Sequence, residues 1–303
     1  MKNKKILITG GAGFIGSNLA LALQEKYPNN EYFIIDDFSS GDFNNLLGFR
    51  GDIIAEDISK IDLNHYFPDG LDIIFHQAAI TDTTIFDQKK MMFSNVEGFR
   101  NILNFVIEHK VKLIYASSAA IYGHSKPPMR VGENEIPANT YGFSKLVIDN
   151  ITRKYFDKLN IIGLRYFNVY GPKEEYKGKM ASMVWQLYLQ MKSGKRPRIF
   201  QYGEQKRDQV YIKDVVRANL LALELDKKGI FDIGTGKATT FNEIVRNLNE
   251  VLETNFKPEY IKNPFKHYQE YTEADLTETR EILGYQPKYD IKKGIQDYFK
   301  NER

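Results

Sequence analysis

The chain has 303 residues, of which 42% are hydrophobic and 27% charged, and its formal net charge is +3. This composition is ordinary for a soluble globular protein, and the length suits one large α/β unit or two unequal domains. Lys and Arg are scattered rather than gathered in a basic arm, so nucleic acid is not an expected partner, and the absence of cysteine excludes disulfides, thiolate catalysis and Cys-ligated metals.

The first element is an apolar run that loosely imitates a secretory signal, because "ILITGGAGFIGSNLALAL" follows the basic "MKNKK". A signal carries a continuous apolar core. This run is instead interrupted by Gly10, Gly11, Gly13, Gly16, Ser17 and Asn18. The sequence also has no stretch of about 18 uninterrupted apolar residues, which a membrane span requires. We therefore expect a cytoplasmic protein with no membrane partner and no metal site.

Short β-branched and aromatic runs then alternate with helical stretches. The strands predicted from them are 5–10, 31–38, 51–58, 72–79, 111–118 and 161–171. Helices are predicted near 17–27, 86–109 and 140–158. Several of the strands are apolar on both faces, as buried parallel strands are. The alternation predicts an α/β fold with a Rossmann-like, doubly wound parallel sheet and helices on both faces.

The pattern changes after about residue 172. A polar loop is followed by an amphipathic run near 181–193, one more strand near 229–236 and a helical tail with polar loops. We expect a larger domain made of 1–170 with about 209–236. A smaller C-terminal α/β domain is expected to contain 171–208 and 237–303.

The segment "ITGGAGFIG" places three glycines directly after a strand and at the start of a helix. Such glycines allow a tight turn, close approach of a pyrophosphate and close helix–strand packing, and the helix N-terminus attracts phosphate. Asp36, about 20 residues further on, can hold a ribose hydroxyl, and Asp37 follows it. The larger domain is therefore predicted to bind a dinucleotide. The expected contacts in the turn are Gly10, Gly13, Phe14, Ile15 and Gly16.

The segment after the second strand bears on the form of the cofactor. A 2′-phosphate requires a nearby cation, whereas a carboxylate repels it. No Lys or Arg lies between Asp36 and Asn45. These residues favour NAD over NADP.

In "NTYGFSKLVIDN", Tyr141 and Lys145 are four residues apart and share one face of the predicted helix. A phenol with a pKa near 10 is a poor base at neutral pH, but a nearby ammonium lowers that pKa. Tyr141 can then take a hydroxyl proton while hydride leaves the same carbon. Ser117 and Ser118, at the carboxyl end of a predicted strand, offer hydroxyls to hold the substrate oxygen.

The same spacing recurs by chance in a chain with 19 Tyr. "YGHSK" at 122–126 also matches, although Pro127 and Pro128 argue against a helix there. The Tyr141–Lys145 pair is therefore informative only together with the glycine turn and the two serines.

Three segments, "TGGAGFIGSN", "YASSAAIYG" and "YGFSK", resemble the extended short-chain dehydrogenase/reductase family, which acts mainly on nucleotide sugars. Four later segments resemble the branch that epimerises an ADP-linked heptose at C6″ for the lipopolysaccharide inner core. They are "LRYFNVYGPKEEYKGKMASMV", "FQYGEQKRDQVYIKDV", "GIFDIGTGKATTFNEI" and "YQEYTEADLTETREILGY". The resemblance implies transient oxidation to a ketone, reduction from the other face, and a tightly bound nicotinamide cofactor. It also implies a homo-oligomer.

The resemblance assigns roles to particular residues. Tyr141 and Lys177 would be the acid/base pair, with Lys145 and Ser118 beside them. From the sequence alone Lys177 is a solvated loop lysine. The cofactor contacts implied are Gln77, Ala78, Ala79, Ile80, Thr81, Asn95, Lys145, Val169 and Lys177. The substrate contacts implied are Ser118, Asn168, Lys179, Gln186, Phe200, Gln201, Tyr202, Gly203, Arg207 and Tyr268.

Arg207 has an alternative role, and the chain departs from the family at several positions. Arg207 suits a diphosphate because a guanidinium binds phosphate oxygens bidentately, but it could equally form a structural salt bridge with Asp208. Lys179 and Gln186 replace a serine and a histidine that are common in the branch. Members that prefer NADP tend to have a basic residue where this chain has Asp42 and Phe43. The family therefore suggests NADP while the residues suggest NAD, and both stay open.

Two rival functions remain. Another nucleotide-sugar epimerase, or a dehydratase, would use the same fold, but a dehydratase usually has Asp-Glu where this chain has "SSAAIYG". A dinucleotide-sensing module that does no chemistry would be expected to lose Tyr141 or Lys145, and both are present.

Overall fold

The computed structural model describes residues 1–82, 87–264 and 269–300. Its core is a seven-stranded sheet in the order β10-β6-β5-β4-β1-β2-β3, in which every neighbouring pair is parallel. The strands are β1 (Lys5–Thr9), β2 (Glu31–Ile35), β3 (Asp52–Ile54), β4 (Ile73–His76), β5 (Lys112–Ser118), β6 (Ile161–Tyr166) and β10 (Gly229–Ile233). The strand order reverses beside β1, and a crevice opens outside the carboxyl ends of strands at such a point.

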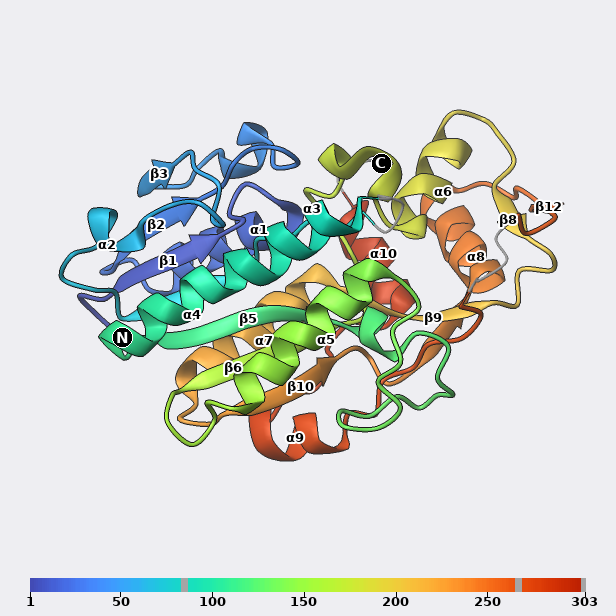
Figure 1. The fold of residues 1–303 in the computed structure, drawn as a ribbon. Helices are drawn as coiled ribbons and strands as arrows, with labels where there is room; N and C mark the ends of the chain where they lie inside the picture. Colours follow the sequence, from blue (N-terminus) through green and yellow to red (C-terminus); the bar gives the residue numbers. More distant parts are fainter. Residues whose placement is uncertain (83–86, 265–268, 301–303) are drawn as a thin grey trace.

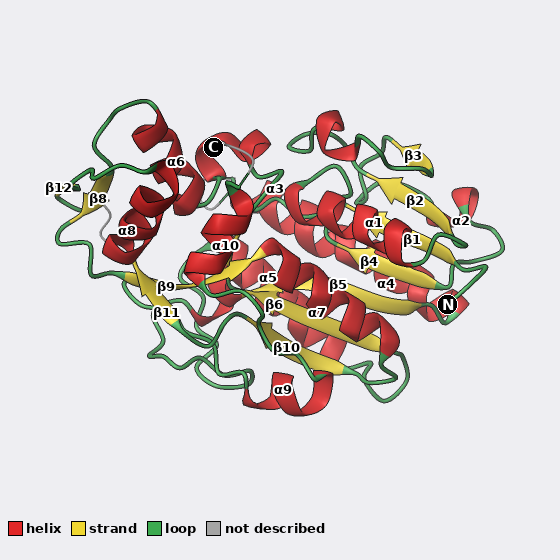
Figure 2. Cartoon of the chain, turned by 180° about the vertical axis from the view of Figure 1, so that it is seen from behind, coloured by secondary structure: helices red, strands yellow, loops and turns green. Residues whose placement is uncertain are grey.

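Helices cover both faces of this sheet. They are α1 (Phe14–Lys26), α2 (Leu63–Tyr66), α3 (Gln88–Met92), α4 (Gly98–His109), α5 (Thr140–Arg153) and α7 (Ile212–Glu224). Figure 1 shows α4 and α5 in front of the sheet, and Figure 2 shows α7 in front when the molecule is seen from behind.

Alternate residues of one strand face the two layers of helices, as a period of two requires. In β1, Ile6 and Ile8 lie in the core that also contains residues of α1 and α7, whereas Leu7 lies in the core with residues of α4 and α5. Strands buried on both faces explain the continuous apolar runs in the sequence. The predicted doubly wound parallel sheet is confirmed.

Two smaller sheets lie at one end of the large one (Figure 1). One has three strands in the order β11-β9-β7, and the other pairs β12 with β8. Their bounds are β7 (Asn168–Tyr170), β8 (Arg198–Phe200), β9 (Lys206–Tyr211), β11 (Ala238–Thr240) and β12 (Glu259–Ile261). The C-terminal half also supplies α6 (Met183–Lys192), α8 (Phe241–Leu252), α9 (Thr277–Leu283) and α10 (Ile291–Tyr298).

The single strand expected over 161–171 was wrong. The chain leaves the large sheet at Phe167, whose N–H donates to Ile233 O at 3.0 Å, and β7 then pairs with β9 in the small sheet. An apolar run predicts that its residues are extended and buried. It does not predict where the chain leaves one sheet and joins another. The large sheet draws on residues 5–233 and the small sheets on 168–261, so the segments interleave, and the division into two domains stays a prediction.

No helix within the described part of the chain has the length and apolar character needed to cross a bilayer.

Candidate active site

A cavity of about 430 Å³ opens at the carboxyl edge of the large sheet, next to the small three-stranded sheet. The Gly-rich turn contributes Phe14 and Ile15 to its wall, and β5 and α5 contribute Ser118, Tyr141 and Lys145. The chain after β6 adds Asn168, Val169 and Lys177, and β9 adds Arg207. Side chains far apart in the sequence thus meet in one space.

The Gly-rich turn between β1 and α1 fits a dinucleotide. Gly10 has a φ of +67°, and a Cβ there would lie 2.6 Å from Ala78 N, so only glycine suits the position. Helix α1 begins at Phe14 after Gly13, and no side chain caps its first turn. Its N-terminal amides and dipole are therefore oriented to bind a phosphate.

A second observation in the cavity wall supports a polar ligand there. Ser117 Oγ is buried and has no hydrogen-bond partner among the described residues, and Ser117 lines the same cavity. A buried hydroxyl without a partner is costly. The residues present therefore fit a nicotinamide dinucleotide, whose phosphates the turn would hold and to which Ser117 would offer a hydroxyl.

The two carboxylates at the end of β2 have different surroundings. Asp36 is buried, and its oxygens accept from the N–H groups of Ala12 and Phe38, each at 2.9 Å. It therefore braces the Gly-rich turn, and burial raises the pKa of its carboxyl. Asp37 is exposed, and its Oδ1 accepts from Ser39 N at 2.9 Å and from Ser39 Oγ at 2.7 Å.

Helix α5 carries Tyr141 and Lys145 on one face. The helix starts where the Asn139 side chain accepts from Gly142 N at 2.8 Å, a typical N-cap. Lys145 Nζ lies 6.0 Å from the centre of the Tyr141 ring and donates to Ala116 O at 2.9 Å. The pair therefore meets at the end of β5, beside Ser118.

The expected lowering of the Tyr141 pKa by Lys145 is not what the structure has. Burial raises the pKa of Tyr141, and only the hydrogen bond with Ser118 acts in the opposite direction. Burial also lowers the pKa of Lys145 to about 8, although the charge of Asp149 opposes this. With a pKa of about 8, Lys145 is still mostly an ammonium at neutral pH, so its charge remains beside the Tyr141 ring.

A buried polar network holds α5 against the sheet. Arg165 of β6 is fully buried and donates from Nε to Asp149 Oδ2 at 2.8 Å and from Nη2 to Glu135 Oε1 at 2.6 Å. Tyr115 of β5 donates to Asp149 Oδ1 at 2.9 Å. Since Asp149 lies one turn after Lys145, this network fixes the part of α5 that faces the cavity.

Lys177 is placed in the cavity by the loop that follows β7. Its Nζ lies 5.5 Å from the centre of the Phe14 ring, and burial lowers its pKa. The loop is held by the fully buried Glu174, which accepts from Gly171 N at 3.0 Å and from Ser182 Oγ at 2.9 Å. Lys177 is thus not the solvated lysine that the sequence alone suggested.

A sequence profile of the NAD dependent epimerase/dehydratase family matches residues 6–234. The chain belongs to this family. The ADP-L-glycero-D-manno-heptose-6-epimerase of Brachyspira hyodysenteriae is 40% identical to it in an alignment 308 positions long, which covers 97% of this chain and 96% of the relative.

Solved structures agree with this membership. The crystal structure of the Helicobacter pylori ADP-L-glycero-D-manno-heptose-6-epimerase matches with a TM-score of 0.93 and 45% identity, over 99% of this chain and 96% of the other. The UDP-glucuronic acid 4-epimerase of Bacillus cereus, solved with UDP-glucuronic acid and NAD, matches with a TM-score of 0.86 and 27% identity, over 99% and 100%. The resemblance to nucleotide-sugar epimerases is confirmed.

The positions that the family implies for the cofactor fall into two groups. Gln77, Ala79, Thr81 and Val169 line the cavity. Lys145 and Lys177 also line it. Ala78, Ile80 and Asn95 lie behind the wall: Ala78 lies under Gly10, and buried Asn95 accepts from Ile80 N at 2.8 Å and donates to Ile80 O at 3.1 Å. Asn95 thus fixes the loop after β4 rather than facing the cavity.

The positions implied for the substrate are more scattered. Ser118, Asn168 and Arg207 line the cavity. Asp208, the alternative partner of Arg207, accepts from the N–H groups of Thr235, Gly236 and Ala274 at 2.7–3.1 Å. This carboxylate therefore joins β9 to two neighbouring segments.

The remaining substrate positions lie outside the cavity wall as the described residues form it. Lys179 is exposed, and Gln186 Nε2 donates to Lys179 O at 3.2 Å and to Ala181 O at 2.7 Å, which closes the loop onto α6. A turn after β8 contains Phe200, Gln201, Tyr202 and Gly203, closed by Gly203 N donating to Phe200 O at 2.7 Å. Tyr268 lies outside the described residues.

Other residues that line the cavity were not expected from the sequence. They are Ala116, Tyr166, Phe167, Met180, Ala181, Ser182, Met183, Gln209 and Phe241, besides Ser117, which was considered only as a hydroxyl donor. Tyr166 pairs with Ser118 in the sheet register, so the alignment of strand ends could have indicated it. Gln209 and Phe241 carry no such signal because they reach the cavity from β9 and from the start of α8, which lie outside the large sheet.

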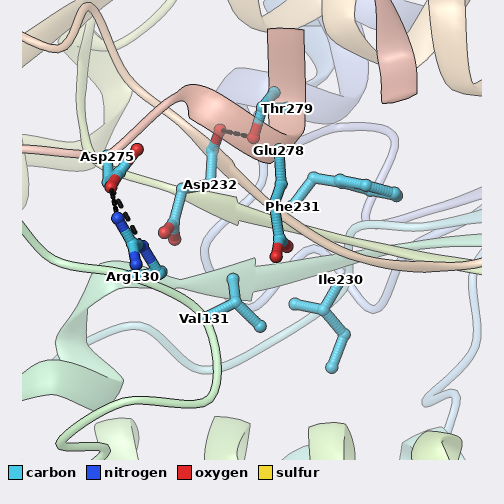
Figure 3. Close-up of a pocket in the computed structure, with 8 residues that line it drawn as sticks. All are labelled: Arg130, Val131, Ile230, Phe231, Asp232, Asp275, Glu278 and Thr279. Carbon is cyan, nitrogen blue, oxygen red and sulfur yellow. Dashed lines mark hydrogen bonds and ion pairs between the residues drawn. The ribbon is translucent and has the colours of Figure 1, made fainter. Parts of the chain in front are cut away.

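A second, much smaller pocket lies beside β10 (Figure 3). Its volume is about 10 Å³, roughly the space that one water requires. Arg130 Nε donates to Asp275 Oδ2 at 3.0 Å, and Thr279 Oγ1 donates to Asp232 O at 3.0 Å. This pocket lies where separate segments of the chain pack together, and it is too small to be a ligand site.

Proposed function

We propose that the chain interconverts ADP-D-glycero-β-D-manno-heptose and ADP-L-glycero-β-D-manno-heptose by inverting C6″, with a bound nicotinamide cofactor. The heptose would serve the lipopolysaccharide inner core, and the working form is a cytoplasmic homo-oligomer. The likeness over nearly the whole chain to two proteins named for this reaction supports the proposal. The observation that carries it is that Tyr141 and Lys177, two potential proton carriers from different elements, line one cavity.

Inversion at a carbinol carbon requires that a hydride and a proton leave and then return on the other face. When bound, the nicotinamide takes the hydride from C6″ and later gives it back. Ser118 holds the substrate oxygen, and Tyr141 takes or gives its proton on one face. The ammonium of Lys145 lies beside the phenol, where it favours the phenolate as it forms.

A second proton carrier is needed because the oxygen moves. Oxidation leaves a planar ketone at C6″, and rotation of this exocyclic group turns its other face to the hydride. The oxygen then lies away from Tyr141. Lys177 is the group we propose for this orientation, since burial lowers its pKa towards a range where it exchanges a proton readily. Arg207 is proposed to hold the diphosphate.

The substrate can be tested by comparison with another nucleotide sugar. We expect purified protein to convert the ADP-heptose and to leave UDP-glucose unchanged when each is followed by anion-exchange chromatography. Formation of UDP-galactose at a similar rate would favour the other nucleotide-sugar epimerases of the family.

NAD is the form of the cofactor that we propose. The exposed carboxylate of Asp37 lies two residues after β2, and no Lys or Arg lies between Asp36 and Asn45. A 2′-phosphate placed there would be repelled. The expected result is that heat-denatured protein releases NAD, as judged by mass spectrometry, and that Asp37→Lys increases the affinity for NADP about 10-fold or more.

The matched control for this substitution is Asp69→Lys, which makes the same charge change at an exposed position of the loop after α2. It should leave the preference for NAD unchanged. Release of NADP from the unmodified protein would contradict this assignment and leave the epimerase proposal intact.

A further inference from the structure

Gln209 of β9 is a buried amide that the reaction proposed above does not use. Only 4% of the residue is exposed, and its Oε1 has no hydrogen-bond partner among the described residues. Gln209 also lines the 430 Å³ cavity. A buried amide oxygen without a donor costs free energy that a bound ligand can recover.

The strand determines where this amide lies. Residues of β9 alternate between two faces: Asp208 turns towards Thr235 and Ala274, and Val210 lies in the core, whereas Arg207 and Gln209 both line the cavity. Two residues along a strand correspond to about 6.6 Å. Gln209 is also the register partner of Asn168 on β7. The cavity face of this small sheet is therefore a polar row of Arg207, Gln209 and Asn168.

The chemistry of the row indicates what each member can bind. Arg207 has only donors, which suit phosphate oxygens. An amide oxygen is an acceptor and cannot pair with a phosphate oxygen, so Gln209 Oε1 requires a donor. In a sugar nucleotide, the donors next to the diphosphate are hydroxyls, of the glycosyl group on one side and of the ribose on the other.

We propose that Gln209 binds the substrate by accepting a hydrogen bond from a hydroxyl adjacent to the diphosphate. This inference rests on the proposed function, because it takes the diphosphate to lie at Arg207. Gln209 binds ground state and transition state alike, so its removal changes binding and not the chemical step.

The test compares two Gln→Met substitutions, which keep the side-chain length and remove the amide. Gln209→Met is expected to raise KM for the ADP-heptose about 10-fold and to leave kcat within about 3-fold of the unmodified enzyme. Gln205→Met is the control, because the Oε1 of Gln205 is also buried without a partner but the residue does not line the cavity as the described residues form it. It should change neither constant.

The affinity for ADP alone, measured by calorimetry, identifies the source of the hydroxyl. An unchanged affinity in Gln209→Met assigns the bond to the glycosyl group, and an affinity reduced by the same factor as KM assigns it to the ribose. A KM unchanged by Gln209→Met, or raised equally by Gln205→Met, would overturn the inference. The unmodified enzyme is measured alongside: if it does not turn over the ADP-heptose, the proposed function has failed instead.

Should Gln209→Met not fold, a crystal structure of the unmodified protein with the ADP-heptose decides the matter. A substrate hydroxyl within about 3.2 Å of the Gln209 amide supports the inference. An amide that bonds only to water overturns it.

Discussion

Replacement of Tyr141 by Phe is expected to reduce epimerisation by about 10²- to 10⁴-fold, the usual contribution of a positioned proton carrier. The substitution removes one hydroxyl and keeps the ring in the wall beside Ser118 and Lys145. Because the Gly-rich turn and Lys145 are unchanged, the cofactor should stay bound. The rate is measured by anion-exchange chromatography of the two epimers, and bound cofactor by absorbance of the purified variant.

The matched control is Tyr66→Phe, the same change at an exposed tyrosine of α2. It should behave as the unmodified enzyme does. A Tyr141→Phe variant with an ordinary rate would contradict the role of Tyr141 and leave Lys177 as the principal proton carrier.

Lys177→Met is expected to cause a loss as large as that of Tyr141→Phe. Methionine keeps the length and the packing of the lysine stem against Phe14 but cannot carry a proton. Lys195→Met, the same change at an exposed position of the loop after α6, should have almost no effect. A nearly normal rate in Lys177→Met would show that another group exchanges the proton when the substrate oxygen lies away from Tyr141.

A single-turnover experiment separates the two roles. If each group serves one orientation of the oxygen, each variant should still oxidise one of the two epimers and form reduced nicotinamide, and the two variants should differ in which epimer they oxidise. Loss of cofactor reduction with both epimers in Lys177→Met would indicate that Lys177 supports binding or the first oxidation step instead.

The parts of the fold that depend on local patterns could be predicted from the sequence. Buried parallel strands appear as apolar runs, and the turn at Gly10 requires a residue that tolerates a φ of +67° and has no Cβ. The four-residue spacing of Tyr141 and Lys145 is enough to predict that they share one face of a helix. These features explain why the sheet and the dinucleotide turn were expected from residues alone.

The two small sheets could not be predicted in the same way. Strands β7, β8, β11 and β12 have three residues each, too few to show a period, and they pair with segments far along the chain. Lys177 is partly buried in the cavity wall because Glu174 closes its loop, an interaction that no spacing rule contains. Burial likewise raises the pKa of Tyr141, whereas sequence reasoning considered only the charge of Lys145.

The central claim is that the chain inverts C6″ of an ADP-heptose with a cofactor that stays bound. The most direct measurement is proton NMR of purified protein mixed with ADP-D-glycero-β-D-manno-heptose and no added nucleotide. We predict conversion to the L-glycero epimer, which would establish the reaction and show that the nicotinamide co-purifies. No conversion, even when NAD and NADP are both supplied, would contradict the claim.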